Sequence, residues 1–211
     1  MQKLAIGLVT IILSNLCYVQ AQNNVSVLEC KYETFKIVGN DSIKLDDKII
    51  RIASDKIGYW GKREGATVLL SIYDFQKSQH LMFGIYGNKY EFSLNDDRKQ
   101  GELLNCKKVI NSFTANAIII LPEEVAKSPQ TDEQSSIFDT VYFDTSVQIV
   151  HYTKGGFSGF IDNGFGYLPI KTIRKILSDT DIVGFTIVTQ LIFKKEVIFT
   201  AEEWATMLNN N

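Results

Sequence analysis

The sequence is short of the side chains that most enzymes use to move protons and hold metal ions. Its 211 residues contain two histidines, His80 and His151, and three cysteines. Zinc sites are built from closely spaced pairs of Cys or His ligands, and Cys30, His80, Cys106 and His151 show no such pairs. We therefore predict no metal site and no cofactor.

The sequence motifs of common enzyme classes are also missing. Residues 155–160 read GGFSGF, so Ser158 lies in a sequence close to the Gly-x-Ser-x-Gly nucleophile elbow, but Phe160 stands where that motif needs its last glycine. No phosphate loop, calcium loop or dinucleotide fingerprint occurs. The sequence therefore favours a protein that is not an enzyme, with a Ser158–His151 pair as an alternative.

Carboxylates leave one further enzymatic alternative open. Asp139 and Asp144 recur in two Phe-Asp-Thr triplets, but residues five apart on a strand point to opposite faces unless a bulge intervenes. Other acidic pairs are adjacent in the sequence and point to opposite faces for the same reason. A hydrolase with carboxylates from distant parts of the chain remains an alternative.

Proline and net charge are both low. Three prolines and no low-complexity tract argue against a disordered or linker-rich chain. A formal charge of −2 gives no electrostatic footprint for nucleic acid or anionic lipid. Beyond residue 21, no apolar run approaches the ~20 residues of a spanning helix. We expect a protein partner, no nucleic acid and no membrane span in the mature chain, with the oligomeric state undetermined.

The N-terminus has the pattern of a secretory signal peptide. Lys3 supplies a positive charge, residues 4–13 form a short apolar run, and Ala21 ends the segment with a small side chain. The apolar run is about half the ~20 residues that a membrane anchor needs. We predict that residues 1–21 are cleaved and that the protein is exported, to the periplasm or the extracellular space.

Removal of that segment changes the cysteine count. Cys17 leaves with it, and Cys30 and Cys106 remain. An even number of cysteines in an oxidising compartment favours pairing. We predict a Cys30–Cys106 disulfide, with two buried, unpaired thiols as the alternative.

Residues 25–108 have the alternating pattern of half-buried strands. Turn signals at residues 39–42 and 87–88 separate successive runs. The predicted fold is mainly β (α+β), an antiparallel sandwich or barrel-like meander with two short helices in its C-terminal half. A polar stretch at 127–136 separates an expected β subdomain, residues 22–126 with the disulfide, from residues 137–211, which we expect to pack on it as one unit.

The C-terminal half mixes element types. A helix over 169–178 is predicted from Pro169 at its start and an apolar stripe. A hairpin over 185–200 is predicted to turn at 194–196. Thr200 and Glu203 form a capping box for a final short helix. Another helical turn is expected at 122–124, and residues 117–121 read as a strand that is covered on both faces.

One stretch allows a comparison with a known family. Residues 54–70, SDKIGYWGKREGATVLL, resemble part of the bacterial C-type lysozyme inhibitors, which are small periplasmic β-barrels with a disulfide. The resemblance covers under a tenth of the chain. It implies an inhibitor or immunity protein for a secreted hydrolase or toxin as one alternative function.

Aromatic residues next to glycines are the candidates for binding. The first group is Tyr59 and Trp60, beside a glycine-flanked charged turn, and the second is a predicted hairpin with Phe157, Phe160, Phe165 and Tyr167. Such rings supply large contact areas at interfaces, although core packing is an alternative for both groups. The function expected is a secreted or periplasmic, non-enzymatic binding or accessory protein that recognises another macromolecule.

Overall fold

The computed structural model describes residues 24–84, 86–94, 102–127, 134–149, 166–178 and 184–209. The expected signal peptide, the Ser158–His151 pair and the candidate residues Phe157, Phe160 and Phe165 lie outside the described residues.

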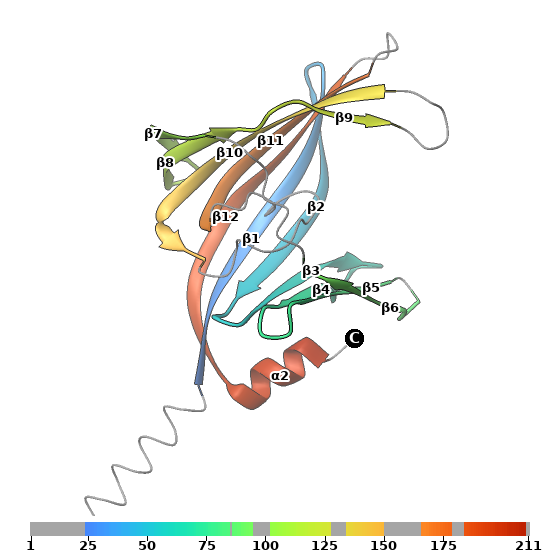
Figure 1. Ribbon diagram of the computed structural model, residues 1–211, viewed down its shortest axis with the longest axis vertical. Helices are drawn as coiled ribbons and strands as arrows, with labels where there is room; N and C mark the ends of the chain where they lie inside the picture. The colour runs from blue at the N-terminus through green and yellow to red at the C-terminus, as the bar shows by residue number, and fades with distance from the viewer. Residues whose placement is uncertain are drawn as a thin grey trace, which may run out of the picture.

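The described chain forms one antiparallel sheet of twelve strands and one helix (Figure 1). The elements are β1 (Asn24–Val38), β2 (Asp41–Ile52), β3 (Lys56–Arg63), β4 (Ala66–Asp74), β5 (Gln79–Phe83), β6 (Lys89–Ser93), β7 (Leu103–Ile110), β8 (Phe113–Ile120), β9 (Glu124–Lys127), β10 (Gln134–Gln148), β11 (Tyr167–Ser178), β12 (Phe185–Thr200) and α2 (Ala201–Asn209). This confirms the mainly β, antiparallel prediction, with one described helix instead of two.

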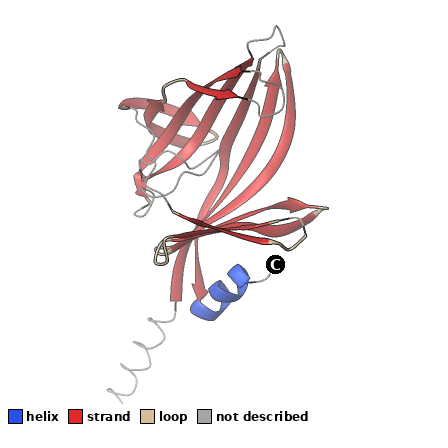
Figure 2. Ribbon diagram, turned by 45° about the vertical axis from the view of Figure 1, so that its right-hand side comes forward, coloured by secondary structure: helices blue, strands red, loops and turns tan. Residues whose placement is uncertain are grey.

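The centre of the sheet is the pair β1 and β12, which come from opposite ends of the chain. Their register runs from Asn24 opposite Thr200 to Ile37 opposite Thr186. From β1 the sheet continues through β2, β3, β4 and β5 to β6, and from β12 through β11, β10 and β8 to β7, with β9 also on β10. The C-terminal strands therefore complete the sheet that the N-terminal strands begin (Figure 2).

The two faces of the sheet are covered differently. Side chains alternate along a strand, so Cys30 and Tyr32 of β1 lie on one face, in the largest apolar cluster, and we call this the core face. Val27 lies on the other, where Trp204 and Leu208 of α2 pack, and we call this the helix face. Fully burying one large apolar side chain stabilises a fold by about 1.5–3 kcal/mol, so both clusters hold the sheet together.

Residues 169–178 are strand β11, and the predicted helix is wrong. The spacing of Ile173 and its apolar neighbours fits both the helical period of 3.6 residues and the strand period of two. The segment is a strand because β10 and β12 flank it and supply hydrogen-bond partners along both of its edges. Pro169 lies beside a register shift against β10, where a missing N–H is tolerated. Its carbonyl accepts a hydrogen bond of 3.0 Å from the buried hydroxyl of Tyr32.

Three shorter predictions are also corrected. The expected turn at 194–196 lies inside the continuous strand β12, where Lys195 pairs with Glu29 at 3.2 Å. The expected helical turn at 122–124 is not formed: residues 122–123 belong to no helix or strand, and Glu124 begins strand β9, which pairs with β10. Residues 117–121 are not covered on both faces, because Ile119 is buried while Ile120 is 61% exposed.

The capping box at the start of α2 is confirmed. The Thr200 backbone N–H donates to Glu203 Oε2 at 2.8 Å, and the Glu203 N–H donates to Thr200 Oγ1 at 3.2 Å. Trp204 and Leu208, one turn apart, are buried against the sheet as their spacing predicts. Within the described residues, no helix has the length and apolar character to cross a bilayer.

Cys30 and Cys106 are free thiols, so the structure does not contain the predicted disulfide. The prediction took β7 as the last strand of the meander that begins with β1. Instead, β7 ends the opposite side of the sheet, with β12, β11, β10 and β8 between it and β1. Burial raises the pKa of the Cys30 thiol to about 12, and the Cys106 thiol donates to the Ala115 carbonyl at 3.6 Å.

Candidate functional site

Tyr59 and Trp60, the first predicted binding residues, lie in the core. Each is 6% exposed, Tyr59 in the apolar cluster of the core face and Trp60 in that of the helix face. The Trp60 ring packs across Gly58, where a Cβ atom would lie 2.3 Å from the ring. Arg51 covers the same ring, with its guanidinium carbon 4.6 Å from the ring centroid. Neither aromatic ring is presented to a partner in this structure.

Tyr167 is the one residue of the second predicted group that the structure describes. It begins β11 and is half-buried against the apolar cluster that contains Val141 and Phe143. The structure therefore assigns it a packing role.

Three of the four exposed aromatic side chains of the described chain lie instead on the hairpin of β5 and β6, and the fourth, Phe193, lies on β12 and is 44% exposed. Tyr86 is 91% exposed, Tyr90 51%, Phe92 49% and Met82 39%. Met82 lies opposite Tyr90, and His80 opposite Phe92, so these side chains share one face of the hairpin. We call Met82, Tyr86, Tyr90 and Phe92 the edge aromatic strip. Exposed apolar groups gathered in one place are typical of interaction sites.

A row of rings connects this strip to the interior of the sheet. The ring of Tyr59 meets Tyr73 edge-on at 5.6 Å, Tyr73 stacks on His80 at 4.2 Å, and His80 lies 5.8 Å from Phe92. Burial lowers the pKa of His80 to about 4, so this ring is neutral at neutral pH. The strip is therefore continuous, along the same face, with a packed row of buried rings.

The strip also lies at an end of the sheet. β6 is the last strand on its side, and among the described strands it pairs with β5 alone (Figure 1). An edge strand presents main-chain N–H and C=O groups that another strand can use. All five residues of β6 are exposed. Rings on one face and unpaired main-chain groups along one edge are the two requirements for binding an extended peptide.

Sequence reasoning predicted this hairpin but not its role. Gly87 has a φ of +74°, as a hairpin-type turn with glycine requires. The available signal was the alternation Lys89-Tyr90-Glu91-Phe92, which places two rings on one face of a short strand with charged residues on the other. Charged side chains on one face of a short strand are typical of a sheet edge.

A second feature is a cavity of about 580 Å³ on the core face. Apolar side chains line most of it, and its polar lining includes Lys194, whose Nζ lies 2.8 Å from Asp144 Oδ2. Burial opposes ionisation of Asp144, but hydrogen bonds from Lys194 and Ser146 outweigh it and hold its pKa below the usual value. The two lysines that line this cavity are therefore already paired within the chain, Lys194 with Asp144 and Lys195 with Glu29.

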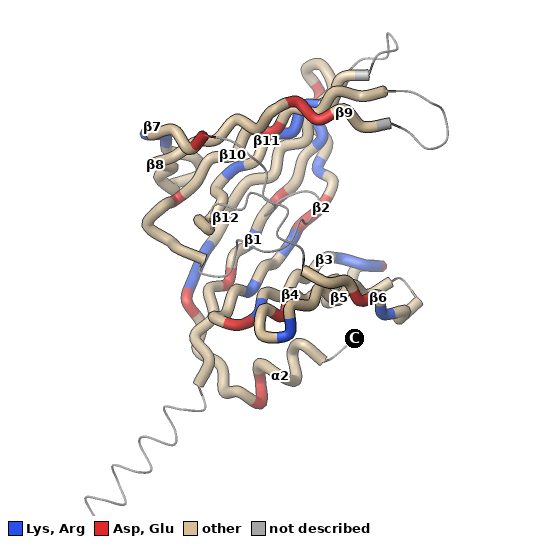
Figure 3. Tube along the Cα trace, viewed as in Figure 1, with Lys and Arg blue, Asp and Glu red and all other residues tan. Residues whose placement is uncertain are grey.

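Asp139 and Asp144, the carboxylates singled out in the sequence, serve structural ion pairs. Arg174 binds both oxygens of Asp139, at 2.8 and 2.7 Å. Figure 3 shows further charges of both signs on β1, β2 and β12. Among the described residues, no group of three or more His, Cys, Asp or Glu side chains is placed to hold a metal ion.

No protein-family model matches this chain, and no curated protein does either. Two solved structures are similar to it at low identity. PNGF-II has 13% identity and a TM-score of 0.49, over 88% of this chain and 30% of that chain. The complement regulator acquiring outer surface protein BbCRASP-4 or ErpC from Borrelia burgdorferi has 12% identity and a TM-score of 0.22, over 86% of this chain and 97% of that chain. Neither likeness carries a functional argument.

Proposed function

We propose that this chain is an exported, non-enzymatic protein that binds another polypeptide at the edge of β6. The observation that carries the proposal is the edge aromatic strip, which combines the exposed rings of Tyr86, Tyr90 and Phe92 with an edge strand. Export rests on the signal-peptide pattern of residues 1–21.

The mode of binding is strand addition. An extended segment of the partner lies alongside β6 and forms main-chain hydrogen bonds with it, and alternate side chains of that segment cover Tyr90 and Phe92. The main-chain bonds supply affinity for any extended chain, whereas the rings select apolar side chains at alternate positions. The ion pairs of Asp139 and Asp144 support a non-enzymatic role, because each of these two carboxylates is neutralised by a cation of the same chain.

Photo-crosslinking in the cells that make the protein tests this proposal. A benzophenone side chain is placed at Tyr90 and, as the matched control, at Val109 of β7, which is 70% exposed at the opposite end of the sheet. We expect a defined crosslinked polypeptide from position 90 and none of the same mass from position 109.

Affinity measurements with the captured polypeptide then test the strip itself. Aromatic residues at the centre of an interface cost about 2 kcal/mol or more when truncated, which is about thirtyfold in Kd. We therefore expect Tyr90→Ser with Phe92→Ser to weaken binding at least thirtyfold, while Val109→Ser leaves it unchanged. Unchanged affinity in the double variant, with the sheet intact by circular dichroism, refutes the proposed site.

A further inference from the structure

The hydrogen bonds at the two ends of the β5–β6 ladder define which main-chain groups of β6 point outward. The Gly84 N–H donates to the Asn88 carbonyl at 2.7 Å, and the Leu94 N–H donates to the Ser78 carbonyl at 3.0 Å. In an antiparallel ladder, hydrogen-bonded and non-hydrogen-bonded pairs alternate. The pairs at both ends are therefore hydrogen-bonded, and so is every second pair between them.

Counting inward by two from either end reaches Tyr90 and Phe92 on β6. Their N–H and C=O groups point toward β5. The N–H and C=O groups of Lys89, Glu91 and Ser93 consequently point away from β5, toward the edge of the sheet. A strand added to this edge forms its hydrogen-bonded pairs at these three residues.

We propose that the segment that pairs with this edge is β6 of a second copy of the chain, so that the protein forms a two-fold symmetric dimer. This rests on the proposed function and names the partner at the same site. A two-fold axis perpendicular to the sheet at Tyr90 places Lys89 of each copy opposite Glu91 of the other. Both residues have outward main-chain groups, so the register satisfies the hydrogen-bond pattern.

Charge selects this register over its neighbour. Antiparallel pairing centred on Glu91 also satisfies the hydrogen-bond pattern, but it places the two Glu91 carboxylates directly opposite each other, which is destabilising. The register centred on Tyr90 replaces that repulsion with two Lys89–Glu91 pairs between the copies. Within the chain, Glu91 already accepts a bond from Gln79 through Oε1, and its second oxygen faces no described cation.

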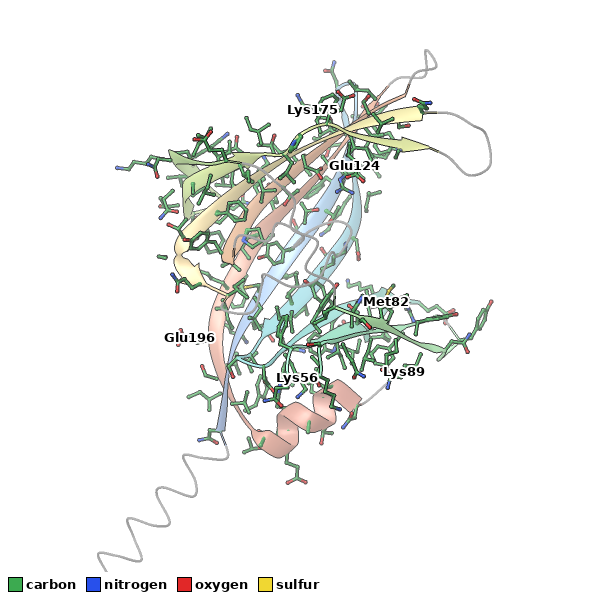
Figure 4. The ribbon with its side chains drawn as sticks, viewed as in Figure 1. Lys56, Met82, Lys89, Glu124, Lys175 and Glu196 are labelled. Carbon is green, nitrogen blue, oxygen red and sulfur yellow. The ribbon has the colours of Figure 1, made fainter. Side chains whose placement is uncertain are left out.

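The faces of the hairpin also agree with this register. Tyr90 of one copy meets Tyr90 of the other in a non-hydrogen-bonded pair, in which side chains approach most closely. The two edge aromatic strips become continuous on one face of the joined sheet. Lys89 and Glu91 lie on the other face, and Figure 4 shows Lys89 and Met82 at this end of the sheet. An isologous contact of this kind closes after two copies.

Disulfide trapping provides a positional test. In the proposed register the two Tyr90 Cα atoms lie roughly 4.5 Å apart, within the range of about 4.4–6.8 Å that a disulfide spans. The two Phe92 Cα atoms are four residues out of register, or about 13 Å along the strands. In a chain that carries Cys106→Ser, we expect oxidation to link Tyr90→Cys into a covalent dimer and to leave Phe92→Cys unlinked.

Charge exchange tests the partner independently. We expect Lys89→Glu to lower the dimer association constant at least tenfold in sedimentation velocity, and Lys89→Glu with Glu91→Lys to restore it. Lys175→Glu is the control, because it makes the same charge change on an exposed residue of β11. If the double variant dimerises again, the weaker association of Lys89→Glu cannot have come from a general loss of fold.

The outcomes separate this proposal from the proposed function. A chain that stays monomeric at all concentrations, or equal trapping of Tyr90→Cys and Phe92→Cys, overturns the dimer. If the Tyr90 crosslinker then captures a different protein, the binding role of the edge stands without the dimer. If it captures nothing, both proposals fail.

Discussion

Acidification is expected to destabilise this fold through His80, before the carboxylates begin to titrate. The ring is 6% exposed and lies between Tyr73, at 4.2 Å, and Phe92, at 5.8 Å. Burial in this layer lowers its pKa from 6.5 to about 4. The unfolded chain, with an ordinary histidine, therefore takes up a proton at a higher pH than the folded chain does.

The size of the effect follows from the difference between the two pKa values. Because the folded pKa lies below the unfolded one, the stabilisation from neutral His80 is complete above about pH 6.5 and is lost as the pH falls toward 4. Proton linkage with these values gives a loss of about 2 kcal/mol between pH 7 and pH 5, and about 3 kcal/mol by pH 4.

Urea unfolding at a series of pH values measures this loss directly. His80→Phe keeps a ring beside Tyr73 but cannot titrate, so its free energy of unfolding should fall by about 2 kcal/mol less than that of the natural chain between pH 7 and pH 5. Tyr90→Phe, a ring replacement on the exposed face of the same hairpin, serves as the control and should keep the natural slope. Parallel pH profiles for the natural chain and His80→Phe would show that the ring is not buried as described.

Three further predictions concern the core, the helix and the ion pairs. In unreduced mature protein that lacks residues 1–21, we expect to count two free thiols after unfolding. In the folded state, Cys106 should be alkylated faster than Cys30, because burial raises the pKa of the Cys30 thiol to about 12. A count of zero free thiols would instead support the disulfide. Trp204→Ala should lower the free energy of unfolding by about 3–5 kcal/mol and Thr200→Ala by about 1 kcal/mol, and equal effects would contradict docking of α2 through its ring. Asp139→Asn should cost about 3–5 kcal/mol in denaturant unfolding, because it removes the carboxylate that binds the partly buried Arg174 through both of its oxygens, whereas Asp46→Asn, whose pair with Lys48 is long at 3.9 Å and partly exposed, should cost under about 1 kcal/mol.

Local chemistry predicted the parts of the fold that depend on neighbours in the sequence. The turn at Gly39 and the hairpin at Gly87 were predictable because glycine alone adopts positive φ without strain, and the structure has φ of +59° and +74° there. The capping box of Thr200 and Glu203 was predictable because both of its hydrogen bonds lie within one helical turn. Alternation of apolar residues identified most strands for the same reason.

Contacts between distant residues determined the rest. Residues 169–178 are a strand because β10 and β12 flank them, and no local pattern shows that. Cys30 and Cys106 are free thiols, and Cys106 lies on β7, which pairs with β8 and not with β1 or β2; that strand order does not follow from spacing along the chain.

The candidate site divides in the same way. The sequence by itself determined that aromatic residues flank charged hairpins, but Tyr59, Tyr86 and Tyr90 look alike in composition and local pattern. Only the tertiary structure decided that Tyr59 is covered by its neighbours while Tyr86 and Tyr90 remain exposed on the last hairpin of one side. The physical reason is that β3 lies between β2 and β4, whereas among the described strands β6 has β5 as its neighbour on one side alone, and packing by neighbouring strands is not encoded in the local pattern.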